Sequence, residues 1–183
     1  MPVTRYSWGA MLLHWVIAIL VIANWRIAES AENLPDTERG EVMGWHFAFG
    51  MLILLLTVAR IVWRLTHKRP PLGGHLKAWE RILARTVHSL FYILLIAMPL
   101  LGWIGMSGYK FPIDMFGITW PVLPTGLNED TGHEILEVHA TLGSVMVLLI
   151  GLHVLGALKH HFWDKDGELW KMLPFGRART PAD

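Results

Sequence analysis

The chain of 183 residues contains no cysteine, and this absence removes several kinds of chemistry at once. Without thiols there are no disulfides, thiolate zinc sites, cysteine-bound iron–sulfur clusters or covalent haem attachment through a C-x-x-C-H motif. Charge is also scarce, because 17% of the residues are charged and 53% are hydrophobic, whereas soluble domains carry about 25% charged residues. With a formal net charge of +1, the chain lacks the basic footprint of a nucleic-acid binder. The composition excludes a disordered protein and favours a membrane protein.

Charged side chains are missing from four long stretches, Trp8 to Trp25, Val42 to Ala59, Thr86 to Tyr109 and Val138 to Leu158. A helix of about 20 apolar residues crosses a bilayer. Because lipid offers no hydrogen-bond partners, a single span must pair its backbone N–H and C=O groups within a helix. We therefore predict an all-α fold, an integral membrane four-helix antiparallel bundle that forms a single membrane domain over residues 1–183. The expected spans lie at about 8–27, 42–64, 82–108 and 135–161. Pro99 is expected to kink the third span.

The first stretch has a second interpretation. Small residues around Ala28, Glu29 and Ser30 resemble the cleavage site of a secretory signal. The apolar run is longer than the roughly 7–15 residues of a typical signal peptide, and it contains His14 and Trp15. A retained membrane span is therefore the favoured reading.

Basic residues are unevenly shared between the two sides of the predicted bundle. Thirteen of the 16 fall in the N-terminal tail, the second connection and the C-terminal tail: Arg5, Arg60, Arg64, Lys68, Arg69, Lys77, Arg81, Arg85, Lys159, Lys165, Lys171, Arg177 and Arg179. The other two connections hold only Arg26, Arg39 and Lys110. The positive-inside rule then predicts a multi-pass protein of the bacterial inner membrane with both termini cytoplasmic. The outer segment from Lys110 to Glu137 is expected to cap the bundle.

Five histidines lie in or at the edges of the spans, and an ionisable residue inside a membrane is a functional candidate. The topology puts His14, His88 and His153 toward the cytoplasm, and His46 and His139 toward the outer face. The depths of these side chains therefore form two groups, one near each surface.

His139 and His153 are separated by 14 residues on one helix, which corresponds to a rise of about 21 Å and nearly a whole number of turns. One helix thus presents two imidazoles to the bundle axis. Since the chain has no cysteine and its spans hold no carboxylate cluster, two b haems with paired histidine ligands fit best.

The outer pairing follows by elimination. His46 is the partner expected for His139, because His133 is expected in the loop before the last helix. Gly50 and Gly143 lie one turn after these ligands and leave room for a flat porphyrin.

The inner pairing leaves two candidates, because His153 could face either His14 or His88. Bulky Tyr92 lies one turn from His88, whereas small residues flank the alternative, so His14 is favoured. The small residues beside the inner ligands are Ala10, Ala18 and Ala157.

The blocks "MLLHWVIAILVIANW", "GWHFAFGMLILLLTVARIVWR", "VHSLFYILLIAMPLLGW" and "VHATLGSVMVLLIGLHVLGALKHHFW" resemble the bacterial cytochrome b561 family, and most closely its superoxide-oxidising member. The resemblance runs from about Tyr6 to Pro174. It implies a four-helix protein with two b haems, one on His14 and His153 and one on His46 and His139. It also implies an oxidoreductase that passes electrons from periplasmic superoxide to ubiquinone at the cytoplasmic side.

Two axial histidines leave iron no open position, so the metal is expected to carry electrons rather than bind oxygen. A quinone that accepts two electrons also takes up protons, and imidazole titrates near neutral pH. His88, His160 and His161, with Lys159 beside them, are therefore the candidates for a quinone site near the inner surface.

The net charge of the outer segments, taken together, is negative and therefore does not attract the superoxide anion. They hold three basic residues against ten acidic ones, Glu29, Glu32, Asp36, Glu38, Glu41, Asp114, Glu129, Asp130, Glu134 and Glu137. Capture of an anion therefore requires Arg26, Arg39 and Lys110 to gather near the outer haem.

Two further functions remain open. The chain could be the haem-bearing membrane anchor of a dehydrogenase, with the acidic outer loops docking the partner subunit or another periplasmic electron donor. It could also be a haem-free transporter or proton relay, although the spans lack the acidic residues that such a relay needs.

Overall fold

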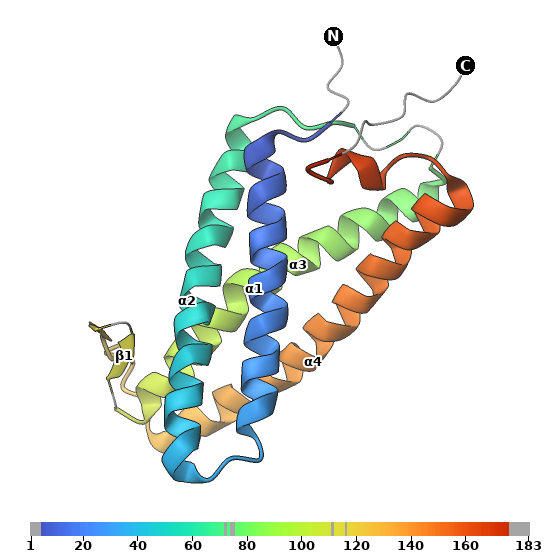
Figure 1. Cartoon of the computed structure of the whole chain (residues 1–183). Helices are drawn as coiled ribbons and strands as arrows, with labels where there is room; N and C mark the ends of the chain where they lie inside the picture. Colours follow the sequence, from blue (N-terminus) through green and yellow to red (C-terminus); the bar gives the residue numbers. More distant parts are fainter. Residues whose placement is uncertain (1–4, 72, 74–75, 111, 116, 176–183) are drawn as a thin grey trace.

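The computed structural model describes residues 5–71, 73, 76–110, 112–115 and 117–175. Four long helices form an antiparallel bundle (Figure 1): α1 (Trp8–Ala31), α2 (Asp36–Thr66), α3 (Ala78–Gly108) and α4 (Glu129–Lys159). Between α3 and α4, β1 (Ile113–Met115) and β2 (Ile118–Trp120) form an antiparallel hairpin. A turn of π-helix, η1 (His160–Asp164), and a short 3₁₀ turn, η2 (Leu169–Lys171), follow α4. The all-α prediction is confirmed, and the hairpin is a small addition that the sequence pattern did not predict.

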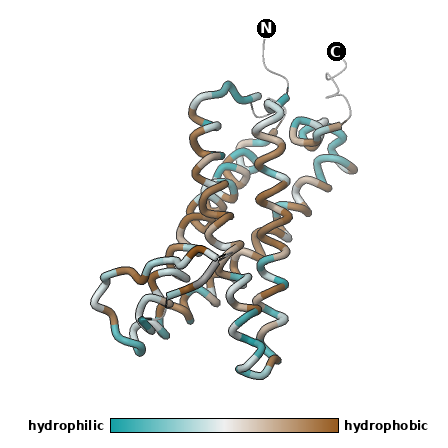
Figure 2. Tube along the Cα trace, turned by 60° about the vertical axis from the view of Figure 1, so that its left-hand side comes forward, coloured by the Kyte–Doolittle hydropathy of each residue, from teal (hydrophilic) through white to brown (hydrophobic). Residues whose placement is uncertain are grey.

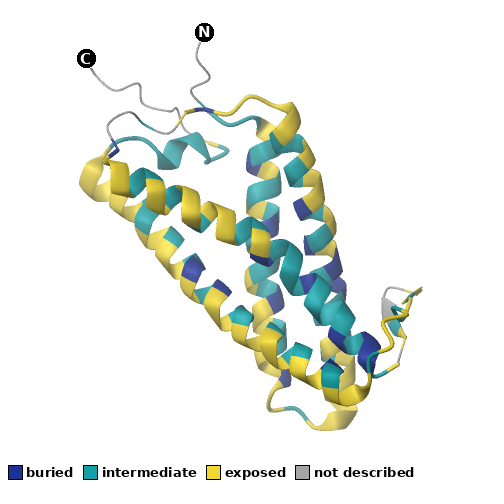
Figure 3. Ribbon diagram, turned by 180° about the vertical axis from the view of Figure 1, so that it is seen from behind, coloured by how far each residue is buried: buried dark blue, intermediate teal, exposed yellow. Residues whose placement is uncertain are grey.

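All four helices are long and apolar enough to cross a membrane. Large apolar side chains point outward along them, among them Leu12, Ile19, Leu55, Leu148 and Leu155. Figure 2 shows brown, hydrophobic middles with more hydrophilic ends, and Figure 3 shows how much of the helical surface is exposed. Such a surface is costly in water and suits lipid, as expected for a multi-pass membrane protein.

α2, α3 and α4 begin earlier than the uncharged runs suggested, whereas α1 begins at Trp8 as expected. At the start of α4, the Asn128 side chain accepts a hydrogen bond from the Thr131 amide at 3.0 Å. At the start of α3, the Glu80 carboxylate accepts one from the Lys77 amide at 2.9 Å. Because these caps satisfy the first amides, α4 includes His133. The prediction that His133 lies in a loop was wrong.

Arg60 and Arg64, which were counted with the second connection, lie inside α2 instead. Arg60 donates to the Tyr92 hydroxyl at 3.2 Å, and the Arg64 guanidinium stands over the ring of the same tyrosine at 5.3 Å. Long arginine stems can cover apolar surface while their charged ends find such partners, so charge alone does not end a helix.

A buried apolar layer separates the two predicted histidine levels. Leu94 of α3 packs with Met146 and Leu149 of α4, and Val21 and Phe91 pack against this cluster. On α4, the two buried residues fall between His139 and His153 in the sequence. α3 continues through Pro99 as one helix.

Both ends of the described chain lie at one end of the bundle (Figure 1). The Tyr6 amide donates to the Lys171 carbonyl at 3.2 Å, and the Trp15 indole donates to the Met172 carbonyl at 3.0 Å. Arg5 donates to the Leu173 carbonyl. We call this end the inner end, following the charge rule, and the opposite end the outer end.

The hairpin lies beside the outer part of α2 (Figure 1) rather than across the end of the bundle. The Trp103 indole of α3 donates to the Pro121 carbonyl at 2.9 Å, and the Leu123 amide donates to the Ser107 hydroxyl at 3.0 Å. These bonds tie the segment that follows the hairpin to the side of α3.

Close backbone contact joins α3 and α4 near the outer end. A Cβ atom on Gly132 would lie 2.7 Å from the Gly105 carbonyl oxygen, and one on Gly108 would lie 2.9 Å from the Gly132 Cα. Small residues that let membrane helices approach in this way are a common packing device.

Replacing Gly132 by Ala should therefore separate α3 from α4 and lower the free energy of unfolding by about 1–3 kcal/mol, as overpacking does. Gly151→Ala is the control, because a Cβ at that helical position has nothing within 4 Å. Thermal melting of the purified variants in detergent measures the difference, and equal melting temperatures would contradict the packing argument.

Candidate metal-binding histidine pairs

His46 of α2 and His139 of α4 face each other near the outer end, with ring centroids 5.9 Å apart. The His46 Nδ1 hydrogen bonds to the Asn24 carbonyl at 3.1 Å, and the His139 Nδ1 to the Met98 carbonyl at 2.9 Å. A carbonyl only accepts, so Nδ1 carries the proton on both rings. Each Nε2 is left with a free lone pair, which is the usual arrangement of a histidine that binds a metal.

Three histidines meet toward the inner end. The ring centroid of His153 lies 6.2 Å from that of His14 on α1 and 5.4 Å from that of His88 on α3. Phe91 also contacts the His153 ring, at 5.4 Å. The structure therefore brings together both candidates that the sequence left open.

A cavity of about 1360 Å³ adjoins the outer pair, and His46, Gly50, His139 and Gly143 are part of its wall. It exceeds the roughly 300–1,000 Å³ of most small-molecule sites. Asn24 also lines it, and the buried side-chain oxygen of this residue has no hydrogen-bond partner within the described part of the chain. The cavity thus offers two imidazoles, small residues at both ligands and an unused polar atom to an occupant.

The distances between the facing histidine rings agree with those of two imidazoles that bind one metal ion. Imidazole nitrogens bind first-row metals such as zinc at about 2 Å, so two ligands on opposite sides have ring centres about 6 Å apart. The His46–His139 distance of 5.9 Å and the His14–His153 distance of 6.2 Å match this value. The ring separations at both ends therefore suit a b haem, and the outer pair also has a cavity beside it.

Arg60 of α2 adds a positive charge beside the inner histidines. Its Nη1 donates to the Ala10 carbonyl of α1 at 3.1 Å, and its Nε donates to the Tyr92 hydroxyl of α3 at 3.2 Å. Sequence reasoning missed this residue because it was treated as a loop charge. Its place inside the predicted span 42–64 was the signal that could have singled it out.

His160, the first of the two quinone candidates after α4, lies in a polar network at the inner end. The His160 Nδ1 lies 2.7 Å from the Asp166 Oδ2 and 2.9 Å from the Asp164 Oδ2. Asp166 also accepts from the Glu168 amide at 3.0 Å, which fixes the carboxylate in the turn before η2. These contacts orient the His160 ring through its Nδ1 atom.

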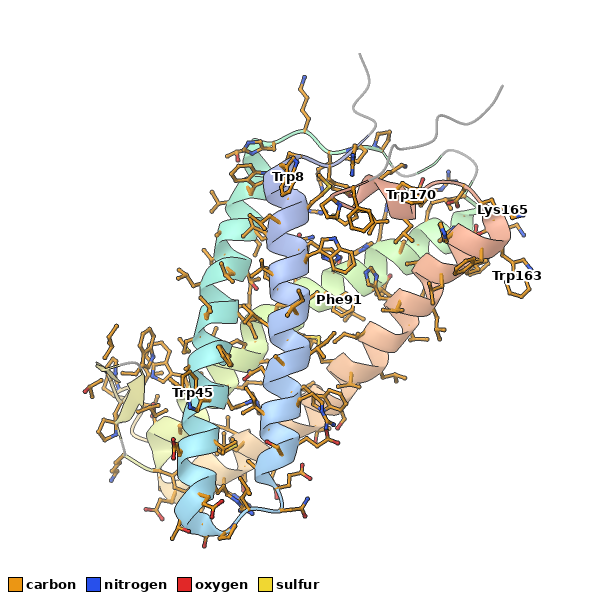
Figure 4. The ribbon with its side chains drawn as sticks, in the orientation of Figure 1. Trp8, Trp45, Phe91, Trp163, Lys165 and Trp170 are labelled. Carbon is orange, nitrogen blue, oxygen red and sulfur yellow. The ribbon has the colours of Figure 1, made fainter. Side chains whose placement is uncertain are left out.

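Lys159 and His161 differ in how they are held. Lys159 is engaged with Glu80 of α3 at 2.6 Å and with Asp164 at 2.8 Å, so its charge is paired. The His161 ring contacts the Trp170 ring at 5.7 Å. Figure 4 shows Trp170 in the segment that crosses the inner end.

The three outer basic residues do not gather. Arg26 forms an ion pair with Glu29. Arg39 donates to two backbone carbonyls at the end of α1, at 3.2 and 2.9 Å, and lines the outer cavity. Lys110 is exposed in the connection after α3. The cluster that superoxide capture was expected to need is therefore reduced to Arg39 at the cavity.

A family model described as prokaryotic cytochrome b561 matches residues 5–175, which includes all four helices. The probable superoxide oxidase CybB of Yersinia pestis is 30% identical over 95% of this chain and 98% of its own length. Cytochrome b561 homolog 2 of Escherichia coli is 31% identical over 92% of this chain and 91% of its own. Cytochrome b562 of Cereibacter sphaeroides is 28% identical over 92% and 94%.

The match covers nearly the whole chain, and the bundle and its facing histidines agree with it. Members of this family bind b haems and transfer electrons in the bacterial inner membrane. The chain therefore belongs to the prokaryotic cytochrome b561 family.

Proposed function

We propose that this protein is a superoxide oxidase that reduces ubiquinone across the inner membrane. Two superoxide anions each give up one electron and leave as O₂, and one ubiquinone takes up two electrons and two protons to become ubiquinol. Haem iron with two imidazole ligands supplies one-electron transfer without an open position for oxygen. The observation that carries the proposal is the pair of facing imidazoles near each end of one bundle, at 5.9 and 6.2 Å.

His46 and His139 are the proposed ligands of the outer haem, and His14 and His153 of the inner one. The backbone carbonyls of Asn24 and Met98 accept hydrogen bonds from Nδ1 of the outer rings, so Nε2 of each ring would be the atom that holds the iron. For the inner haem, the 6.2 Å distance favours His14 over His88 at 5.4 Å.

Single replacements test these assignments. His46→Ala or His139→Ala should remove the outer haem alone, and His14→Ala or His153→Ala the inner haem alone, because each loses one of two axial ligands. Haem content per chain and the visible spectrum of the reduced protein measure the loss.

His88→Ala is the matched control, since this histidine touches His153 but is assigned no iron. It should keep both haems. A His88→Ala variant that loses a haem while His14→Ala keeps both would overturn the inner pairing.

Superoxide must approach the outer haem against an acidic surface, and Arg39 is the residue proposed to admit it. Glu29, Glu32 and Glu41 line the same cavity, and Arg26 is paired with Glu29. The guanidinium of Arg39 is bonded to neutral carbonyls, so its positive charge remains available to an anion. The similarity to the probable superoxide oxidase of Yersinia pestis adds support for superoxide as the donor.

Arg39→Met should therefore slow haem reduction by superoxide about 3- to 10-fold and weaken its decline with added salt, because local attraction is lost. Lys110→Met, which removes an exposed outer charge that does not line the cavity, is the control and should change both less. Stopped-flow absorbance with a superoxide source and ubiquinone present follows haem reduction and ubiquinol formation. If superoxide leaves the wild-type haems oxidised while ubiquinol reduces them, the proposed donor is wrong.

The quinone is proposed to bind at the inner end beside His160, with His88 and His161 as further candidates. Asp166 holds the Nδ1 side of the His160 ring, so Nε2 is the atom that can exchange a proton with a quinone oxygen. This gives ubiquinone a proton donor near the inner surface and near the inner haem ligands.

Asp166→Asn should lower ubiquinol formation by at least about tenfold, a typical effect of disturbing a general acid, while leaving haem content and haem reduction unchanged. The asparagine oxygen can still accept from the Glu168 amide, which preserves the turn. His161→Ala is the comparison variant at the neighbouring position. Because the Asp164 Oδ2 also lies 2.9 Å from the same Nδ1, the double variant Asp164→Asn/Asp166→Asn is measured as well. An unchanged rate of quinone reduction in both variants would remove His160 from the proton path.

A second function is favoured by the ten acidic residues of the outer segments. Such a surface could dock a dehydrogenase subunit, for which this chain would be the haem-bearing membrane anchor. Stoichiometric copurification of a second subunit supports this function, and superoxide-driven ubiquinol formation by the isolated chain supports the first.

A further inference from the structure

Arg60 is a charged residue in the interior of a membrane helix. It lies six residues before the end of α2, about 9 Å along the helix axis. Its side chain is partly buried and bridges three helices through the Ala10 carbonyl and the Tyr92 hydroxyl. Both partners are neutral, and the described residues supply no carboxylate that pairs with it. An arginine this close to a helix end can usually extend to the membrane interface, whereas this one bonds to α1 and α3 instead.

The positive charge lies among the proposed inner ligands. Ala10, whose carbonyl it contacts, is one helical turn from His14, and Tyr92 is one turn from His88. The two hydrogen bonds hold the guanidinium between α1 and α3, beside the helix turns that carry His14 and His88. Water therefore screens this charge less than it would screen an exposed one.

The outer pair has a different electrostatic setting. Its cavity is lined by Glu29, Glu32 and Glu41 together with Arg39, so negative side chains outnumber positive ones there. Positive charge therefore predominates near the inner histidines, and negative charge predominates near the outer pair. A metal centre near Arg60 gains more from an added electron than one near the acidic cavity.

We propose that Arg60 sets the direction of electron flow by holding the reduction potential of the inner haem above that of the outer haem. The residue is a positioning charge rather than a ligand, and it acts through space on the centre held by His14 and His153. This inference rests on the proposed pair of haems. It adds an electrostatic reason why electrons that enter at the outer haem continue to the inner one.

The test is a spectroscopic redox titration of the full-length protein in detergent, which resolves the two haems without any turnover. Arg60→Met should lower the inner potential toward that of the outer haem and leave the outer potential in place. Arg60→Lys keeps the charge and should stay close to wild type. Arg85→Met removes an exposed inner-end charge that water screens, and it should have little effect.

Tyr92 offers a second pair of variants that keeps the arginine. Tyr92→Glu, titrated at pH 8, places a carboxylate beside the guanidinium and should lower the inner potential as Arg60→Met does. Tyr92→Phe removes only the hydroxyl and should leave the potential unchanged. This pair decides the question if Arg60→Met fails to retain the inner haem.

An inner potential that is the same in Arg60→Met, or in Tyr92→Glu, as in Arg85→Met would overturn the role of Arg60 while leaving the two-haem proposal intact. A wild-type protein without an inner haem would instead overturn the proposed function on which the inference rests.

Discussion

Imidazole rings from different helices face each other near both ends of a lipid-embedded bundle, and the outer rings are fixed by hydrogen bonds from Nδ1 to backbone carbonyls. Two packing features of the bundle help to position these rings. The glycine contact between α3 and α4 sets the spacing at the outer end, and the buried layer around Leu94 separates the two levels. Because Nδ1 of each outer ring is hydrogen-bonded to a backbone carbonyl, Nε2 is the nitrogen that each ring has available for a metal.

The two levels differ in charge, and this difference connects structure with reaction. Near the outer pair, the cavity wall is rich in carboxylates, with Arg39 as its positive residue. Near the inner group, Arg60 bridges three helices through neutral partners. Beyond it, Asp166 orients His160 where protons from the cytoplasm would be available to a quinone. In the proposed function, a path for electrons and a source of protons therefore meet at one end of the bundle.

The number of helices, their apolar faces and the two histidine levels could be predicted from the sequence, because lipid imposes a length and a composition on every span. The helix ends could not, since local caps such as Asn128 extend α4 past the apolar run and take in His133. The place of Arg60 was missed for a related reason, because a charge was equated with a loop. The inner pairing stayed open because His14 and His88 approach His153 from different helices at one depth, which periodicity on single helices does not distinguish.

We propose that one chain holds two haems, each between two imidazoles. Electron paramagnetic resonance of the oxidised, purified protein, combined with a haem count per chain, examines both properties at once. Two low-spin ferric signals of equal weight and two haems per polypeptide are expected. One haem per chain, or a high-spin ferric signal from the intact protein, would rule out this arrangement.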